Sequence, residues 1–173
     1  MKKIYIFGLG AIGSNVLIQL IKKYPDYEFI GVDFDKVEER NLNTQIYFLS
    51  HINIPKVQAV KAVLASKLKQ FKYTAVQIKL ESEKDFSVIW GKKVLDKNDV
   101  IIDCFDNVTA RNLMMTIKHD NILHAGFSPE YTAEILWDER YDVPGEVDPT
   151  KGDICTMTDA VSFIQYVTSL VAY

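Results

Sequence analysis

The sequence has few of the residues that mark disulfide-stabilised, zinc-binding or membrane proteins. It contains two cysteines, Cys104 and Cys155, too few for a disulfide framework and without the CxxC pairs of a structural zinc site. Its first apolar run, residues 4–7, ends at Gly8. That run is too short for a signal sequence, and no later run reaches the roughly 20 apolar residues of a membrane span. We therefore expect a cytoplasmic protein without zinc and without a membrane partner.

An excess of one sign of charge is also missing. The chain has 20 Lys and Arg against 23 Asp and Glu, a formal net charge of −3. This balance gives no electrostatic footprint for nucleic acid or an anionic membrane. Hydrophobic residues make up 48% and charged residues 25% of the 173 residues, which argues against disorder and predicts one globular domain over residues 1–173.

The order of hydrophobic patterns predicts an α/β fold. Residues 4–7 and 28–33 have the pattern of buried strands, and residues 11–24 between them have helical spacing. Residues 34–54 then form a long structured connection. The remaining patterns predict helices over 55–70, 107–118 and about 157–173, strands over 73–80, 100–104, 121–125 and 131–137, and a crossover loop over about 138–156. We expect a Rossmann-like, mostly parallel sheet with helices on both faces.

A glycine-rich motif, Gly8-Leu9-Gly10-Ala11-Ile12-Gly13, joins the first strand to the first helix. Glycines permit a sharp turn and let phosphate oxygens approach the backbone, and the N–H groups at a helix start favour an anion. Asp33 lies 20 residues past Gly13, at the end of the second strand, where a carboxylate can accept from ribose hydroxyls. The pattern indicates nucleotide binding, and the alternative is a turn that only packs the helix on the sheet.

Later motifs add to this one. In chain order, the sequence has GxGxxG at 8–13, Asp33-Phe34-Asp35-Lys36-Val37, Asn41-Leu42-Asn43-Thr44-Gln45, Pro55-Lys56, and Asp103-Cys104-Phe105-Asp106-Asn107 with Arg111 one turn on. This series resembles the ThiF/MoeB/ubiquitin-activating (E1-like) superfamily over nearly the whole chain. The resemblance implies the E1-like adenylation fold and ATP- and Mg²⁺-dependent adenylation of a carboxylate, usually the C-terminal glycine of a small ubiquitin-like or sulfur-carrier protein.

The resemblance also implies roles for individual residues. Gly8, Gly10 and Gly13 would face the phosphates and Asp33 the ribose, with Asp35 in the same nucleotide-binding set. Asn41 and Lys56 would contact the triphosphate, and Asp106 would hold Mg²⁺. These residue types suit the chemistry, because a carboxylate attacking the α-phosphorus needs its developing charge neutralised. Relatives work as dimers, so a homodimer or an E1-like heterodimer is expected.

Cys155 resembles the Cys-Thr that carries the catalytic thiol of E1 enzymes, and it lies where the family has its crossover loop. A thiolate there could take the acyl group from the adenylate. The alternative is a cysteine at a helix start, because the neighbouring Asp153 and Asp159 would raise its pKa. Cys104, inside an apolar strand, is a core residue.

Other polar residues have structural alternatives. Lys56 could be a solvated lysine of the first helical turn, and Asp103 and Asn107 could be capping residues. Arg111 is as suited to bridging Asp106 or a neighbouring loop as to touching nucleotide. The three histidines, His51, His119 and His124, have no metal-ligand spacing and are expected to be structural.

The chain departs from the family pattern at Thr44, where relatives have an arginine that contacts the γ-phosphate. It also starts at the first strand, without the helical arm of bacterial relatives, and is shorter than they are. These departures favour a second function, a nucleotide-binding scaffold that pairs with another subunit without catalysis. A third, which the first forty residues alone would allow, is a nicotinamide-dependent oxidoreductase.

Overall fold

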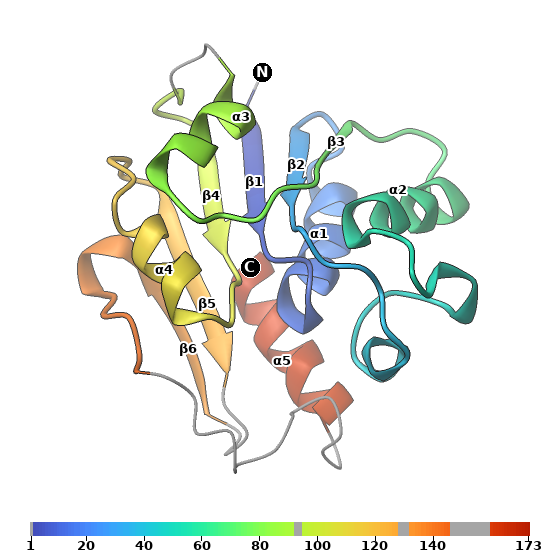
Figure 1. Ribbon diagram of the computed structural model, residues 1–173. Helices are drawn as coiled ribbons and strands as arrows, with labels where there is room; N and C mark the ends of the chain where they lie inside the picture. The colour runs from blue at the N-terminus through green and yellow to red at the C-terminus, as the bar shows by residue number, and fades with distance from the viewer. Residues whose placement is uncertain (1, 92–94, 128–131, 146–159) are drawn as a thin grey trace.

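The computed structural model describes residues 2–91, 95–127, 132–145 and 160–173, and in them one sheet has the strand order β3-β2-β1-β4-β5-β6 (Figure 1). The strands are β1 (Lys3–Phe7), β2 (Glu28–Val32), β3 (Tyr73–Val76), β4 (Val100–Asp103), β5 (Ile122–Phe127) and β6 (Ala133–Trp137). Strands β1 to β5 pair in parallel, and β6 runs antiparallel to β5. The predicted mostly parallel α/β sheet is confirmed.

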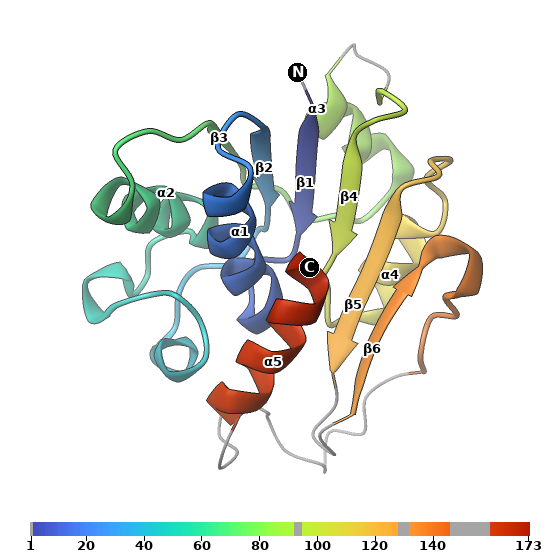
Figure 2. The same ribbon diagram turned by 180° about the vertical axis from the view of Figure 1, so that it is seen from behind.

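Helices cover both faces of the sheet. They are α1 (Ala11–Lys23), α2 (Lys56–Lys67), α3 (Phe86–Trp90), α4 (Val108–Met114) and α5 (Ala160–Ala172). Figures 1 and 2 show α3 and α4 on one face and α1, α2 and α5 on the other. The predicted helices on both faces are confirmed.

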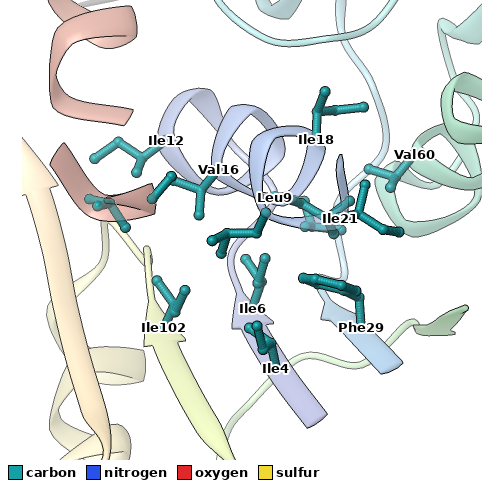
Figure 3. Close-up of a cluster of buried hydrophobic side chains, with 14 of the residues drawn as sticks. Ile4, Ile6, Leu9, Ile12, Val16, Ile18, Ile21, Phe29, Val60 and Ile102 are labelled. Atoms are coloured by element: carbon teal, nitrogen blue, oxygen red, sulfur yellow. The ribbon is translucent and has the colours of Figure 1, made fainter. Parts of the chain in front are cut away.

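Alternation along the strands divides the core into two layers. Ile4 and Ile6 of β1 pack with α1, α2 and α5, whereas Tyr5 and Phe7 pack with α3 and α4. Figure 3 shows the first layer, where Ile12, Val16 and other side chains of α1 meet the strand residues. Burial on both faces explains why these strands read as continuous apolar runs.

Some predicted bounds were too long. The predicted strand over 73–80 ends at Val76, which pairs with Val32, the last residue of its neighbour β2. The predicted helix over 107–118 ends at Met114, because the amides of Thr116 and Ile117 bond three residues back, as in a 3₁₀ turn. Helix α3 and the 3₁₀ helices η1 (Glu39–Asn43), η2 (Leu49–His51), η3 (Glu83–Asp85) and η4 (Asp138–Arg140) were not predicted. Elements of three to five residues are too short to show a hydrophobic period.

The long connection over residues 34–54 folds back onto the start of α1. Val37 forms a bridge with Ile52, and Lys36 with Pro55, so the segment closes on itself. Inside it, the Tyr47 hydroxyl donates to the Leu9 carbonyl at 2.8 Å. Tyr47 therefore ties the connection to the glycine-rich turn. No helix in the described part of the chain is both long enough and apolar enough to cross a membrane.

Candidate functional site

A cavity of about 480 Å³ lies where the loops after β1, β2 and β4 meet the C-terminal end of β5. The turn after β1 contributes Gly10, the loop after β2 contributes Asp35, and the loop after β4 contributes Asp106. The carboxyl ends of parallel strands are the usual ligand site of an open α/β sheet. The fold thus brings predicted site residues from distant parts of the chain to one cavity.

The three glycines of the GxGxxG motif have different surroundings. Gly8 has φ of +83°, and a Cβ there would lie 2.8 Å from the Cys104 carbonyl oxygen, so the turn after β1 requires glycine. A Cβ on Gly13 would collide with the carbonyl oxygen of Gly8. Gly10 has open space where its Cβ would be, and it lines the cavity. Gly8 and Gly13 therefore shape the turn, and Gly10 gives a ligand access to the backbone.

Asp33 supports this turn from behind. Its side chain is buried, Oδ2 accepts from the Leu9 amide at 2.7 Å, and Oδ1 accepts from the Asp35 amide at 2.8 Å. Burial raises the pKa of Asp33, and the nearby Lys56 ammonium and the two amides offset only part of that effect. Both carboxylate oxygens thus bind backbone, and Asp33 is not among the residues that line the cavity. Its predicted contact with ribose stays a prediction.

Lys56 and Asp35 form an ion pair in the cavity wall. Lys56 is the first residue of α2 and only 8% exposed, with Nζ 3.0 Å from Asp35 Oδ2 and 4.0 Å from Asp33 Oδ2. The Lys56 amide also donates to the Asp35 carbonyl at 2.8 Å. This burial and pairing differ from those of a solvated lysine on the first turn of a helix. The predicted contact of Lys56 with a triphosphate remains untested.

The 3₁₀ helix η1 supplies a polar wall. Asn41 is buried, accepts with Oδ1 from the Glu38 amide at 2.9 Å, and lines the cavity beside Gln45. Oε1 of Gln45 is buried without a hydrogen-bond partner among the described residues. Thr44, at the position of the family arginine, is buried, and its carbonyl accepts from Asn15 Nδ2 at 3.0 Å.

The loop after β4 carries Asp106 at the cavity, with its side chain exposed. Asn107 caps α4, since its Oδ1 accepts from the Ala110 amide at 2.7 Å, as one alternative predicted. Asp103 does not cap the helix. Its Oδ1 accepts from the Phe105 amide at 3.0 Å, and its Oδ2 lies 2.9 Å from His124 Nδ1.

Arg111, which lines the cavity, belongs to a group of interacting polar side chains beside α4. Arg111 donates to the Phe105 carbonyl and the Tyr141 hydroxyl, so it bridges neighbouring loops. The Tyr141 ring lies against His124 with centroids 3.9 Å apart and planes at 5°. His124 Nε2 lies 3.0 Å from Asp138 Oδ1. Sequence reasoning missed this stack, although alternation on β5 places His124 on the same face as the buried Ile122.

The other histidines and cysteines have structural surroundings or lie outside the description. His51 Nδ1 accepts from the Phe48 amide at 3.2 Å, and His119 Nε2 lies 2.9 Å from the Asp99 carbonyl oxygen. Cys104 lies in the cavity wall, and burial raises the pKa of its thiol. Cys155 lies outside the described residues. The described residues contain no group of three or more metal-binding side chains.

Comparison with known proteins gives relatives in sequence and in fold. The molybdopterin-synthase adenylyltransferase of Haemophilus influenzae is 30% identical over 115 residues, which are 64% of this chain and 43% of that protein. The prephenate dehydrogenase of Lactococcus lactis is 47% identical over 38 residues, or 22% of this chain and 11% of that protein. The chain thus spans less than half the length of these curated relatives.

Solved structures share the fold at low sequence identity. Escherichia coli MccB, solved with MccA, superposes with a TM-score of 0.73 over 99% of this chain and 54% of its own, at 16% identity.

 E. coli tRNA N6-threonylcarbamoyladenosine dehydratase, TcdA, solved with AMP, superposes with a TM-score of 0.59 over 97% of this chain and 65% of its own, at 16% identity. At this identity the likeness is one of fold.

The family follows from the sequence match together with this fold. The model of the ThiF family matches residues 1–127, which include β1 to β5 and the motifs from Gly8 to Arg111. The chain belongs to the ThiF family.

Proposed function

We propose that the cavity binds ATP and that the protein adenylates the C-terminal carboxylate of a small ubiquitin-like or sulfur-carrier protein. The observation that carries the proposal is the convergence of Gly10, Asn41, Lys56 and Asp106 on one cavity in a ThiF-family fold. These residues come from four separate segments, so their meeting is a property of the fold.

The cavity wall suits a nucleotide. Open space above Gly10 leaves the backbone at the start of α1 accessible, and helix N-termini favour phosphate. The buried Oε1 of Gln45 lacks a described partner, and a buried acceptor of this kind is costly unless a ligand or water donates to it. A ligand with both phosphate oxygens and hydrogen-bond donors, such as ATP, matches both features.

The proposed reaction forms one bond and breaks one. A carboxylate oxygen of the carrier attacks the α-phosphorus, the bond from that phosphorus to the bridging β-phosphate oxygen breaks, and pyrophosphate leaves with the electron pair. The attack brings negative charges together, so preorganised positive groups lower the barrier. Lys56 is held by its ion pair with Asp35, and we infer that it neutralises the phosphates during this step.

Asp106 is the residue we propose to hold Mg²⁺. Its carboxylate is exposed at the cavity, and Mg²⁺ is usually bound by one or two carboxylates together with substrate phosphates and waters. A single aspartate therefore fits, without the larger ligand cluster of a resident metal site. When bound, Mg²⁺ supplies charge neutralisation at the phosphates.

Named relatives support the substrate class. One curated relative is a molybdopterin-synthase adenylyltransferase, MccB was solved with MccA, and TcdA was solved with AMP. We infer that this chain works with a protein or peptide partner, as one subunit of a homodimer or an E1-like heterodimer. We further propose that Cys155 accepts the acyl group, since a thiolate can attack the adenylate and release AMP.

Exchange of radiolabelled pyrophosphate into ATP tests the adenylation. With a carrier that ends in glycine and is encoded beside this chain, the wild type should catalyse exchange. Asp106→Ala should reduce exchange at least about a hundredfold, because lost charge stabilisation of this kind costs 10²–10³ in rate. Asp120→Ala, an exposed aspartate away from the cavity, is the matched control and should retain exchange.

Two results would contradict the proposal. One is absence of exchange by the wild type with every such carrier at saturating ATP, and the other is full exchange by Asp106→Ala. Tight ATP binding without turnover, together with a stable mixed dimer, would instead favour a non-catalytic, nucleotide-binding scaffold subunit. The replacement of the family arginine by Thr44 supports that alternative.

A further inference from the structure

Arg111 is a buried cation that keeps one nitrogen unused. It lies on α4, is 8% exposed and lines the cavity. Its Nε donates to the Phe105 carbonyl and its Nη1 to the Tyr141 hydroxyl, so the guanidinium is held in place. In the described part of the chain, Nη2 has no hydrogen-bond partner, and it is not one of the fully buried atoms that lack one. Nη2 is therefore accessible from the cavity.

The neighbouring carboxylates do not take this nitrogen. Asp103 uses Oδ1 to accept from the Phe105 amide and Oδ2 for His124 Nδ1. Glu134 of β6 lines the cavity, but it forms no ion pair with any described cation. The charge of Arg111 therefore faces the cavity without a carboxylate beside it. An anionic oxygen of a ligand is the partner that such an N–H group favours.

Gly126 makes room for this arrangement. It lies on β5, where alternation places it on the same face as His124. A Cβ on Gly126 would lie 2.5 Å from Arg111 Nη2 and 3.2 Å from Nη1. The missing side chain lets the guanidinium lie against the C-terminal end of β5. This contact places Nη2 at a known position in the sheet.

That position is on the far side of the cavity from Lys56. The strand order is β2-β1-β4-β5, and Lys56 pairs with Asp35 in the loop after β2. At a spacing of about 4.8 Å per strand, β2 and β5 are about 14 Å apart. Gly10, after β1, lies between them. Phosphates held between Gly10 and Lys56 would leave Arg111 on the side opposite the leaving pyrophosphate.

This arrangement matches the direction of attack. In transfer of a phosphoryl group, the attacking and leaving oxygens are roughly in line. If pyrophosphate leaves toward Lys56, the nucleophile approaches from the side of β4 and β5, where Arg111 lies. The nucleophile of the proposed reaction is a carboxylate, and a guanidinium N–H is a strong donor to a carboxylate.

We propose that Arg111 Nη2 binds the C-terminal carboxylate of the carrier and orients it toward the α-phosphorus. The assignment rests on the proposed function for the identity of this carboxylate. One carboxylate oxygen accepts from Nη2, and the other forms the bond to phosphorus while the bond to the bridging oxygen of pyrophosphate breaks. No proton moves in this step. The guanidinium offsets the repulsion between the carboxylate and the phosphate, and its two protein contacts fix the direction of approach.

Calorimetric titration with two forms of the carrier tests the assignment without turnover. One form has a free C-terminal carboxylate and the other a C-terminal amide, and both are titrated without nucleotide. The wild type should bind the free acid about tenfold or more tightly than the amide, as expected for one hydrogen bond to a charged group. Arg111→Gln should reduce this ratio to about twofold or less. A purely structural role of Arg111 would weaken both forms equally and leave the ratio unchanged.

Gly126→Ala is a second variant that keeps the arginine. The added methyl group meets only the end of the Arg111 side chain, so the guanidinium must shift while the backbone stays. The preference for the free acid should fall here as well. Arg140→Ala is the matched control, because Arg140 is an exposed arginine that does not line the cavity. It should keep the preference of the wild type.

The outcomes separate this assignment from the proposed function. If Arg111→Gln keeps the preference, or if the wild type has none, the assignment is wrong even where pyrophosphate exchange occurs. Weakening of AMP binding by Arg111→Gln as large as the loss of acid binding would assign Nη2 to a phosphate and overturn it too. Loss of the preference in Arg111→Gln and Gly126→Ala, with no exchange by the wild type, would support the carboxylate site and contradict adenylation.

Discussion

Gly10 and Gly13 share one motif but have different neighbours, and this difference gives a prediction. A methyl group on Gly13 would collide with the Gly8 carbonyl oxygen, and backbone cannot yield as a flexible side chain can. We expect Gly13→Ala to lower the free energy of unfolding by about 1–3 kcal/mol or more. That loss exceeds the helix-propensity gain of at most about 1 kcal/mol. Urea denaturation measures it.

The matched variant is Gly10→Ala. Because Gly10 has nothing within 4 Å of the added Cβ, its stability should change by less than about 1 kcal/mol. Its affinity for AMP should fall, since the methyl group occupies the approach to the backbone at the cavity. Equal stability losses in the two variants would show that the motif glycines have the same role.

The sequence located the larger elements because their patterns are local. The alternation and helical spacing that predicted β1, α1 and β2 depend on residues close together in the chain. The motifs likewise predicted that Asp35, Lys56 and Asp106 belong to one site. The Arg111–Tyr141–His124 stack was beyond such reasoning, because it joins α4, β5 and the segment after β6 through tertiary contacts.

This stack makes a prediction about the pH dependence of stability. Burial alone would lower the pKa of His124, but hydrogen bonds and charge from Asp103 and Asp138 outweigh it and raise the pKa. The native state therefore holds a proton that the unfolded chain releases. The stabilisation is full below the unfolded pKa of about 6.5 and is lost as pH rises through the folded pKa.

We expect the free energy of unfolding of the wild type, relative to His124→Gln, to fall as pH rises above about 6.5, with a slope of at most about 1.4 kcal/mol per pH unit. Glutamine does not titrate, so the difference isolates His124. Urea unfolding at several pH values from 6 to about 9 measures it. His119→Gln, whose partner is a backbone carbonyl, is the control. Parallel stability curves for the wild type and His124→Gln would contradict the assignment.

On the scale of the whole molecule, α5, the last described helix, packs against α1, the first helix. Lys23 Nζ at the end of α1 donates to the carbonyl oxygens of Ala172 and Tyr173 at 3.2 and 3.3 Å. Figure 2 shows α5 beside α1 on the same face of the sheet. At its other end, Ile164 packs with Ala11 and Phe127, two residues that line the cavity. Helix α5 thus connects the core to the site.

Ile164→Ala should therefore reduce both stability and nucleotide affinity. Ile164 is 1% exposed, and truncation of a buried isoleucine costs about 2–5 kcal/mol. At about 2–4 °C per kcal/mol for a chain of this size, the melting temperature should fall by roughly 5–20 °C. Leu170→Ala, on the same helix but 49% exposed, should change neither quantity appreciably. Thermal denaturation with and without AMP measures both effects, and equal losses in the two variants would mean that α5 does not support the site through this contact.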